Sequence, residues 1–239
     1  MSGQLTFDLA GRPALGRGDF LTAEANRTAL AALDAPGGWP LGRMLLLGPR
    51  GAGKSHLAAI WAGDHGARRL DQSALGGDEA DQMAQRACTE GGAAVIEDVD
   101  RIIAAGGAAS RPQAEAALFH LLNLCAARQC RLLLTARRAP QDWGVRLPDL
   151  ASRLEATAQT RLGPPDEALL AAVLVKLFAD RQLEVRPDLI EWLSLRMDRD
   201  LGLARDLVDR LDRAALAEKR PLTRRAAGAA LDKLTAERQ

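Results

Sequence analysis

The sequence predicts an α/β fold, a parallel sheet covered by helices on both faces, followed by a small all-helical unit. Short apolar runs alternate with helical patterns as far as Pro164-Pro165. Beyond these prolines every apolar stripe has the helical period. Alternating strands and helices require right-handed crossovers, which place the strands parallel in one sheet with helices on each side. We expect five strands in this sheet.

The individual elements follow from local hydrophobic pattern. The expected strands are residues 43–47, about 67–71, 93–97, 131–135 and, more weakly marked, 157–161. The expected helices between them are 53–63, about 79–88, 114–127 and a short helix that ends near Arg153. The 114–127 helix places Leu118, Leu121 and Cys125 on one face, as a helix packed on a sheet requires.

The chain divides into three parts by composition. Residues 1–18 are rich in glycine and have neither the helical nor the strand periodicity, so we expect a flexible tail. Residues 19–163 form the α/β unit, and residues 164–239 form the helical unit after the Pro164-Pro165 hinge. The last helix is expected to begin after Thr223, a suitable N-cap residue.

The composition limits the classes of protein to which the chain can belong. The 239 residues carry a net charge of +1, which gives no global attraction to nucleic acid. The three cysteines, Cys88, Cys125 and Cys130, lack metal-ligand spacing, and an odd number argues against a disulfide framework. They are therefore interpreted as buried thiols in a reducing compartment. The sequence has no membrane-spanning stretch or signal pattern, so a cytoplasmic protein is expected.

Residues 48–55, Gly-Pro-Arg-Gly-Ala-Gly-Lys-Ser, form a complete Walker A loop between the 43–47 strand and the next helix. The glycines allow successive backbone N–H groups to face an anion, and the helix N-terminus adds its dipole. Lys54 would contact the β- and γ-phosphates of a nucleotide, and the Ser55 hydroxyl would bind Mg²⁺. The residues expected at the nucleotide are Gly48, Pro49, Arg50, Gly51, Ala52, Gly53, Lys54, Ser55 and His56.

Two carboxylates end the buried 93–97 strand. Glu97 and Asp98 fit the Walker B position, where one acid holds Mg²⁺ and a second orients the attacking water. We assign the metal to Glu97 and the catalytic role to Asp98. An acidic pair after a strand is also common in a solvated loop, and only the Walker A loop favours the functional interpretation.

Two further residues follow the sheet. Thr135 ends the 131–135 strand, where it is either a polar sensor of the γ-phosphate or a threonine at the edge of the core. Arg153 lies just before the hinge and is either an ordinary surface arginine or an arginine supplied across a subunit boundary to a transferring phosphoryl group.

Taken in order, these blocks resemble the AAA+ P-loop ATPases of the clade of the bacterial initiator DnaA, and more narrowly its replication-regulating members. The resemblance covers roughly residues 18–235. It implies that Arg153 occupies the arginine-finger position, that the helical unit is the AAA+ lid, and that residues 20–26 lie near the adenine.

The N-terminal tail contains Gln4-Leu5-Thr6-Phe7-Asp8-Leu9, which resembles the peptide that binds the replicative sliding clamp. Gln4 can form a hydrogen bond at a pocket rim while Leu5, Phe7 and Leu9 fill apolar subsites. A flexible tail suits this role because it orders only on binding.

The chain departs from the family pattern at three positions. Gly202 stands where the lid usually offers a sensor arginine, and Arg199 and Arg205 are expected on other faces. Arg137 replaces an expected acidic residue, and Glu97 replaces the usual aspartate. Nucleotide binding tolerates these changes better than turnover does, so slow or absent hydrolysis in the chain's own site is expected.

The resemblance implies a regulator that binds ADP or ATP with Mg²⁺, docks on the DNA polymerase III sliding clamp and inserts Arg153 into ATP-loaded DnaA. It would contact DNA only through the clamp, and no membrane partner is expected. Self-association stays open. The alternatives are a DnaC-like helicase loader, a clamp-loader subunit, or a DNA-binding module that uses the basic 219–225 stretch.

Overall fold

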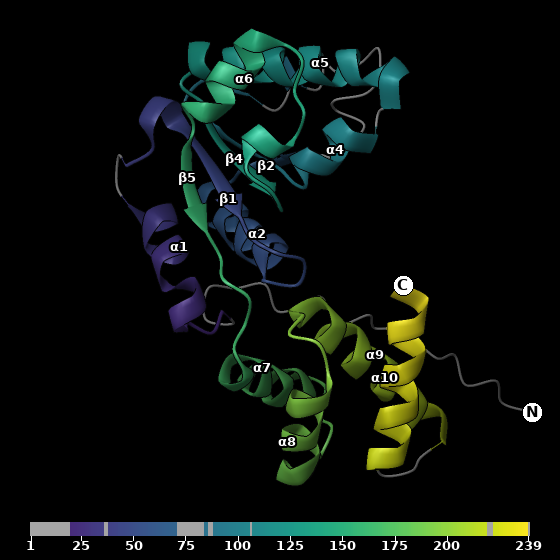
Figure 1. The fold of residues 1–239 in the computed structure, drawn as a ribbon. Coiled ribbons are helices and arrows are strands. Elements are labelled where there is room, and N and C mark those ends of the chain that lie inside the picture. The colour runs from purple at the N-terminus through teal and green to yellow at the C-terminus, as the bar shows by residue number, and fades with distance from the viewer. Residues whose placement is uncertain are drawn as a thin grey trace, which may run out of the picture.

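The computed structural model of the chain describes residues 20–35, 38–70, 84–85, 88–105, 107–218 and 222–238. Two groups of elements are evident in Figure 1: a sheet with helices on both faces, and four C-terminal helices beneath it. Among the described residues, none of the helices combines the length and apolar character that a bilayer-spanning segment needs.

The sheet confirms the predicted strands. It has five parallel strands in the order β2-β3-β4-β1-β5. Their bounds are β1 Arg43–Leu47, β2 Arg68–Leu70, β3 Ala93–Ile96, β4 Arg131–Ala136 and β5 Ala158–Arg161. β3 ends one residue earlier than predicted, so Glu97 is the first residue beyond the strand.

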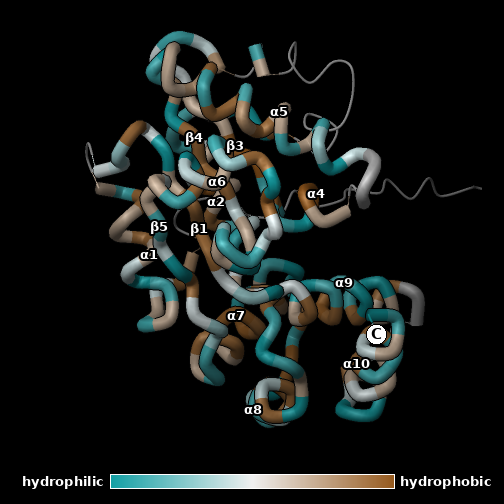
Figure 2. Tube along the Cα trace, turned by 45° about the horizontal axis from the view of Figure 1, so that its top comes forward, coloured by the Kyte–Doolittle hydropathy of each residue, from teal (hydrophilic) through white to brown (hydrophobic). Residues whose placement is uncertain are grey.

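Side chains alternate between the two faces of the sheet, as the period of a strand requires. Leu46 of β1 and Leu133 of β4 pack against α1 and α2, whereas Leu45 and Leu134 pack against α4, α5 and α6. Figure 2 shows hydrophobic colour along the central strands that these helices cover. Both faces are thus buried, which explains the continuous apolar runs in the sequence.

The helices of this part differ from the prediction in three places. Their bounds are α1 Glu24–Asp34, α2 Lys54–His65, α4 Val99–Ala105, α5 Gly107–Ala127 and α6 Pro148–Glu155, with short 3₁₀ turns at Pro40–Gly42 and Pro140–Asp142. α1 and α4 were not predicted, and α5 begins before the expected residue 114. Most of the predicted helix at about 79–88 lies outside the described residues. Within that range, residues 84 and 85 are described and are helical.

The C-terminal helices form a bundle with its own core. They are α7 Glu167–Asp180, α8 Pro187–Arg196, α9 Leu201–Glu218 and α10 Arg224–Arg238. The fully buried Leu174, Leu193 and Leu207 join three of them. The Thr223 hydroxyl accepts a hydrogen bond from the Ala226 N–H, which confirms the predicted N-cap. The Pro164-Pro165 hinge predicted from sequence lies between β5 and α7.

A buried carboxylate fixes the segment that leads into α6. Glu115 of α5 is only 3% exposed. Its oxygens accept hydrogen bonds from the backbone N–H groups of Arg146 at 3.1 Å and Leu147 at 2.8 Å. Because α6 begins at the next residue and carries Arg153, this carboxylate sets the position of that arginine.

Replacing Glu115 by alanine leaves two inward-facing N–H groups without an acceptor, so we expect the free energy of unfolding to fall by about 3 kcal/mol. Glu115→Gln keeps an acceptor oxygen but not the charge, and its loss should be smaller. Urea unfolding followed by circular dichroism measures both, with the exposed Glu155→Ala as control. Equal stability of Glu115→Ala and the control would contradict this role.

Candidate functional site

The Walker A loop joins β1 to α2, as the motif requires. Gly51 and Gly53 have φ values of +72° and +96°, a region that side-chain-bearing residues rarely adopt. Gly53 is the N-cap residue of α2, so the free N–H groups of the first helical turn open onto the loop. This geometry provides the anion-binding end of a helix.

Lys54 is buried beneath the loop with 7% of its surface exposed. Its ammonium group donates hydrogen bonds to the carbonyl oxygens of Gly48 and Pro49, each at 2.9 Å. Burial lowers the pKa of Lys54, and the nearby negative charge of Asp98 opposes that shift. An anion bound beside the ammonium would stabilise its charged form further.

A cavity of about 1010 Å³ lies between the loop and the C-terminal helices. Residues 50–56 form one wall, and residues of α7 and α9 form the opposite wall. Phe20, Leu21 and Asn26 line it as well, so the segment expected near an adenine reaches the same space as the loop. The Phe20 ring meets the His56 imidazole edge-on, with centroids 5.7 Å apart.

The two carboxylates predicted for the site, Glu97 and Asp98, lie in different surroundings. Asp98 lines the cavity, with a φ of +52° and its N–H donating to the Thr135 hydroxyl at 3.0 Å. Glu97 instead forms an ion pair with Arg69 of β2 and is absent from the described cavity lining. The geometry therefore does not support the metal-ligand role assigned to Glu97. It also ties Thr135, 1% exposed, to the backbone of Asp98.

The cavity is rich in arginine. Arg137 lies 3.9 Å from the Asp98 carboxylate and Arg50 lies 3.8 Å from that of Asp200. Arg205 lines the cavity beside Gly202, so its expected placement on another face was wrong. The reason is helical spacing: residues three apart on α9 share a face. Among the described residues, the Arg205 guanidinium has no carboxylate partner.

The start of α9 closes directly on the loop. The Leu201 N–H donates to the Gly51 carbonyl at 2.9 Å. Asp200 caps α9 by accepting from the Leu203 N–H at 2.8 Å and also accepts from Arg238 at 3.1 Å. A Cβ at position 51 would lie 2.3 Å from the Asp200 carboxyl carbon. Glycine at 51 therefore serves both the turn and this contact.

Arg153 belongs to a different region. It lies near the end of α6, half-buried, with its guanidinium carbon 5.1 Å from the centre of the Phe119 ring. It does not line the described cavity, and α6 lies at the end of the sheet away from the C-terminal helices (Figure 1). The predicted clamp-binding residues, Gln4, Leu5, Phe7 and Leu9, lie outside the described residues.

Comparison with known proteins places this architecture. Residues 166–224 match the family described as "Hda, lid domain". Domain III of the Thermotoga maritima replication initiation protein DnaA superposes with a TM-score of 0.74 at 18% identity, covering 93% of this chain and 97% of that one. AMPPCP-bound DnaA from Aquifex aeolicus gives a TM-score of 0.61 at 19% identity, covering 84% and 65%.

The AAA domain of FIGL-1 also matches, with a TM-score of 0.66 at 14% identity, covering 92% of this chain and 84% of that one. The chain spans about two thirds of the length of the AMPPCP-bound DnaA. These likenesses extend over most of the chain and identify its fold, and the family match covers the C-terminal helices. The chain has the AAA+ fold seen in DnaA domain III, and its C-terminal helices are similar to the lid domain of Hda over residues 166–224.

Proposed function

We propose that the chain is a nucleotide-binding AAA+ regulator that docks on the DNA polymerase sliding clamp and stimulates hydrolysis of ATP bound to the initiator DnaA, thereby limiting replication initiation. The observation that carries this proposal is the position of Arg153, away from its own cavity and without a carboxylate partner among the described residues. The Hda-type lid and the DnaA-like fold support a partner of the DnaA class.

The nucleotide is ADP or ATP. The left-handed glycines, the buried Lys54 and the N-terminus of α2 fit a polyphosphate, and Arg50, Arg137 and Arg205 line the same cavity. Similar proteins add support, since one DnaA structure contains AMPPCP and one FIGL-1 structure contains ADP. The Ser55 hydroxyl would hold Mg²⁺, which neutralises charge on the β- and γ-phosphates.

Hydrolysis in this site is expected to be slow. The Glu97 carboxylate is occupied by Arg69, and Arg101 and Arg137 lie beside Asp98, the acid that would orient water. These cations favour a bound phosphate and hold the carboxylate away from the role of a base. The site therefore suits retention of nucleotide more than its turnover.

Arg153 acts on the neighbour. The Phe119 ring supports the guanidinium through a cation–π contact, which leaves its N–H groups available to donate hydrogen bonds to phosphate oxygens. A DnaA protomer of similar fold would present a corresponding cavity to this arginine. Arginine placed there in trans stabilises charge on the transferring phosphoryl group.

The tail residues Gln4, Leu5, Phe7 and Leu9 deliver this activity to the clamp. The peptide combines one hydrogen-bonding side chain with three apolar side chains, which suits a shallow hydrophobic pocket. DNA would then be contacted only through the clamp that encircles it.

Lys54→Ala removes the buried ammonium, and we expect affinity for both ADP and ATP to fall at least about 100-fold, because charge-assisted bonds to phosphate are lost. Fluorescent-nucleotide titration measures the affinity. Lys233→Ala, an exposed lysine of α10, is the control. Unchanged affinity of Lys54→Ala would place the nucleotide elsewhere.

Arg153→Ala should return the rate of DnaA-bound ATP hydrolysis to that of DnaA alone, because arginine fingers given in trans contribute roughly 10³–10⁵ in rate. The assay contains DnaA–ATP, DNA-loaded clamp and the variant, each omitted in turn. Arg196→Ala also loses an arginine–aromatic contact, to Trp192 in the lid, and serves as the matched control. Full stimulation by Arg153→Ala would exclude it from the mechanism.

A double variant, Leu5→Ala with Phe7→Ala, should lose clamp binding in a pull-down while its nucleotide affinity stays unchanged, because neither substitution alters a residue of the described cavity lining. Thr6→Ala, between the two apolar positions, is the control. Clamp capture equal to that of the unaltered protein would refute the tail as the clamp-binding segment.

A further inference from the structure

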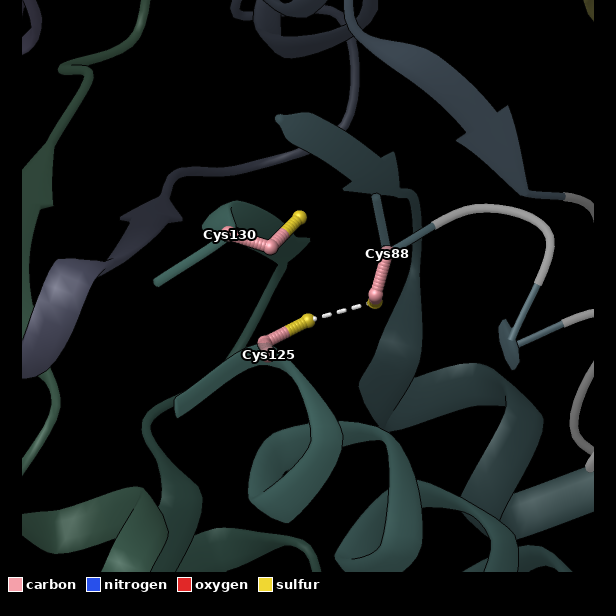
Figure 3. Close-up of side chains that lie close together, drawn as sticks. All are labelled: Cys88, Cys125 and Cys130. Carbon is pink, nitrogen blue, oxygen red and sulfur yellow. Dashed lines mark hydrogen bonds between the residues drawn. The ribbon is translucent and has the colours of Figure 1, made fainter. Parts of the chain in front are cut away.

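The fold brings the three cysteines of the chain together, although the sequence separates them. Cys88, Cys125 and Cys130 are each 0–1% exposed, and their sulfur atoms all lie within 4.8 Å of one another. Figure 3 shows the three side chains converging, with the Cys88 and Cys125 sulfur atoms 2.8 Å apart. The interpretation of these cysteines as separate buried thiols missed this cluster.

The backbone around the cluster is well fixed. The Cys130 N–H donates to the Cys125 carbonyl at 2.8 Å, which closes the turn between α5 and β4. In that turn Arg128 donates to the Cys88 carbonyl at 2.7 Å and to the Gln85 carbonyl at 2.8 Å. The three thiols are thus held by one hydrogen-bonded turn, as preorganised ligands require.

A buried cation lies in the same region without a counter-charge. Arg43 is 2% exposed, and its Nε and Nη1 atoms have no hydrogen-bond partner in the described parts of the chain. It begins β1 and pairs there with Leu132, two residues after Cys130. Burial and then Arg153 lower the pKa of Arg43, and a negative charge on Cys125 would oppose this.

A buried, unpaired guanidinium is strongly unfavourable unless an anion lies near it. Among the described residues no carboxylate is paired with Arg43, so thiolates are the available anions.

We propose that Cys88, Cys125 and Cys130 bind one thiophilic closed-shell cation, Zn²⁺ or Cu⁺, as three thiolates whose excess negative charge Arg43 offsets. Binding releases three thiol protons to solvent for each cation taken up. With Zn²⁺ the three thiolates leave a net charge of −1, which the guanidinium balances. Thiolate sulfur is the ligand that both ions prefer.

The existing geometry is close to that of such a site. Sulfur–zinc bonds of about 2.3 Å place ligand sulfurs about 3.8 Å apart in a tetrahedral arrangement. The Cys88 and Cys125 sulfurs, at 2.8 Å, must separate by about 1 Å, which a small rotation about their Cα–Cβ bonds provides. The site differs in its ligand chemistry from the Mg²⁺ site proposed at Ser55, so the two sites can be distinguished.

The test uses the full-length, reduced protein under anaerobic conditions, with Zn²⁺ and Cu⁺ added in separate arms. Desalted protein should retain one ion per chain in at least one arm, measured by elemental analysis. Co²⁺, used as a spectroscopic probe, should give near-ultraviolet thiolate-to-cobalt charge-transfer bands. Lys54→Ala should retain the metal, which separates this site from the nucleotide site and from the proposed function.

Each single Cys→Ser variant should bind at least about 100-fold more weakly, and Arg43→Met about 10-fold more weakly, because ligands outweigh their supporting groups. In the unaltered protein the ion should slow reaction of all three thiols with a disulfide reagent, a readout that does not depend on folding of variants. Retention no greater than that of the triple Cys→Ser variant would overturn the proposal. A second outcome would also overturn the proposal. In it, the isolated protein has a mass lower by two hydrogen atoms because of a Cys88–Cys125 disulfide, and it binds no ion after that disulfide is reduced.

Discussion

The contact between Gly51 and the start of α9 holds the functional cavity together. The Gly51 carbonyl accepts the Leu201 N–H, and Asp200 packs so closely against Gly51 that no Cβ fits between them. Because the sheet and the lid have separate hydrophobic cores, this polar contact determines how the second wall of the cavity faces the first. A group that binds the loop therefore also touches the element that orients the lid.

Charge is distributed around that contact in a specific way. Asp200 joins Arg50 of the loop to Arg238 of the last helix, so the carboxylate links the loop to both α9 and α10. An anion bound at the loop would compete with Asp200 for Arg50. Such an anion would weaken the contact between Arg50 of the loop and Asp200 at the start of the lid helix α9.

Arginines lie at both ends of the parallel sheet, and the two groups have different surroundings. Arg50, Arg137 and Arg205 surround the chain's own cavity at the carboxyl ends of the strands, where ligands of open α/β sheets bind. Arg153 lies at the opposite end, on a helix positioned by the buried Glu115. A rigid core between the two ends permits one surface to retain a ligand while the other presents a guanidinium outward.

Local pattern determined much of this protein. The five strands, the order of strand, loop and helix from β1 to α2 and the cap at Thr223 were predicted correctly, because each depends on hydrophobic period or on backbone chemistry within a few residues. The tertiary structure alone decided which groups meet across the chain. Glu97 forms an ion pair with Arg69 and is absent from the described cavity lining, whereas Arg205 lines the same cavity as the loop. The three cysteines converge beside a buried Arg43. These pairings join strands and helices far apart in sequence, and such contacts depend on packing that no local period encodes.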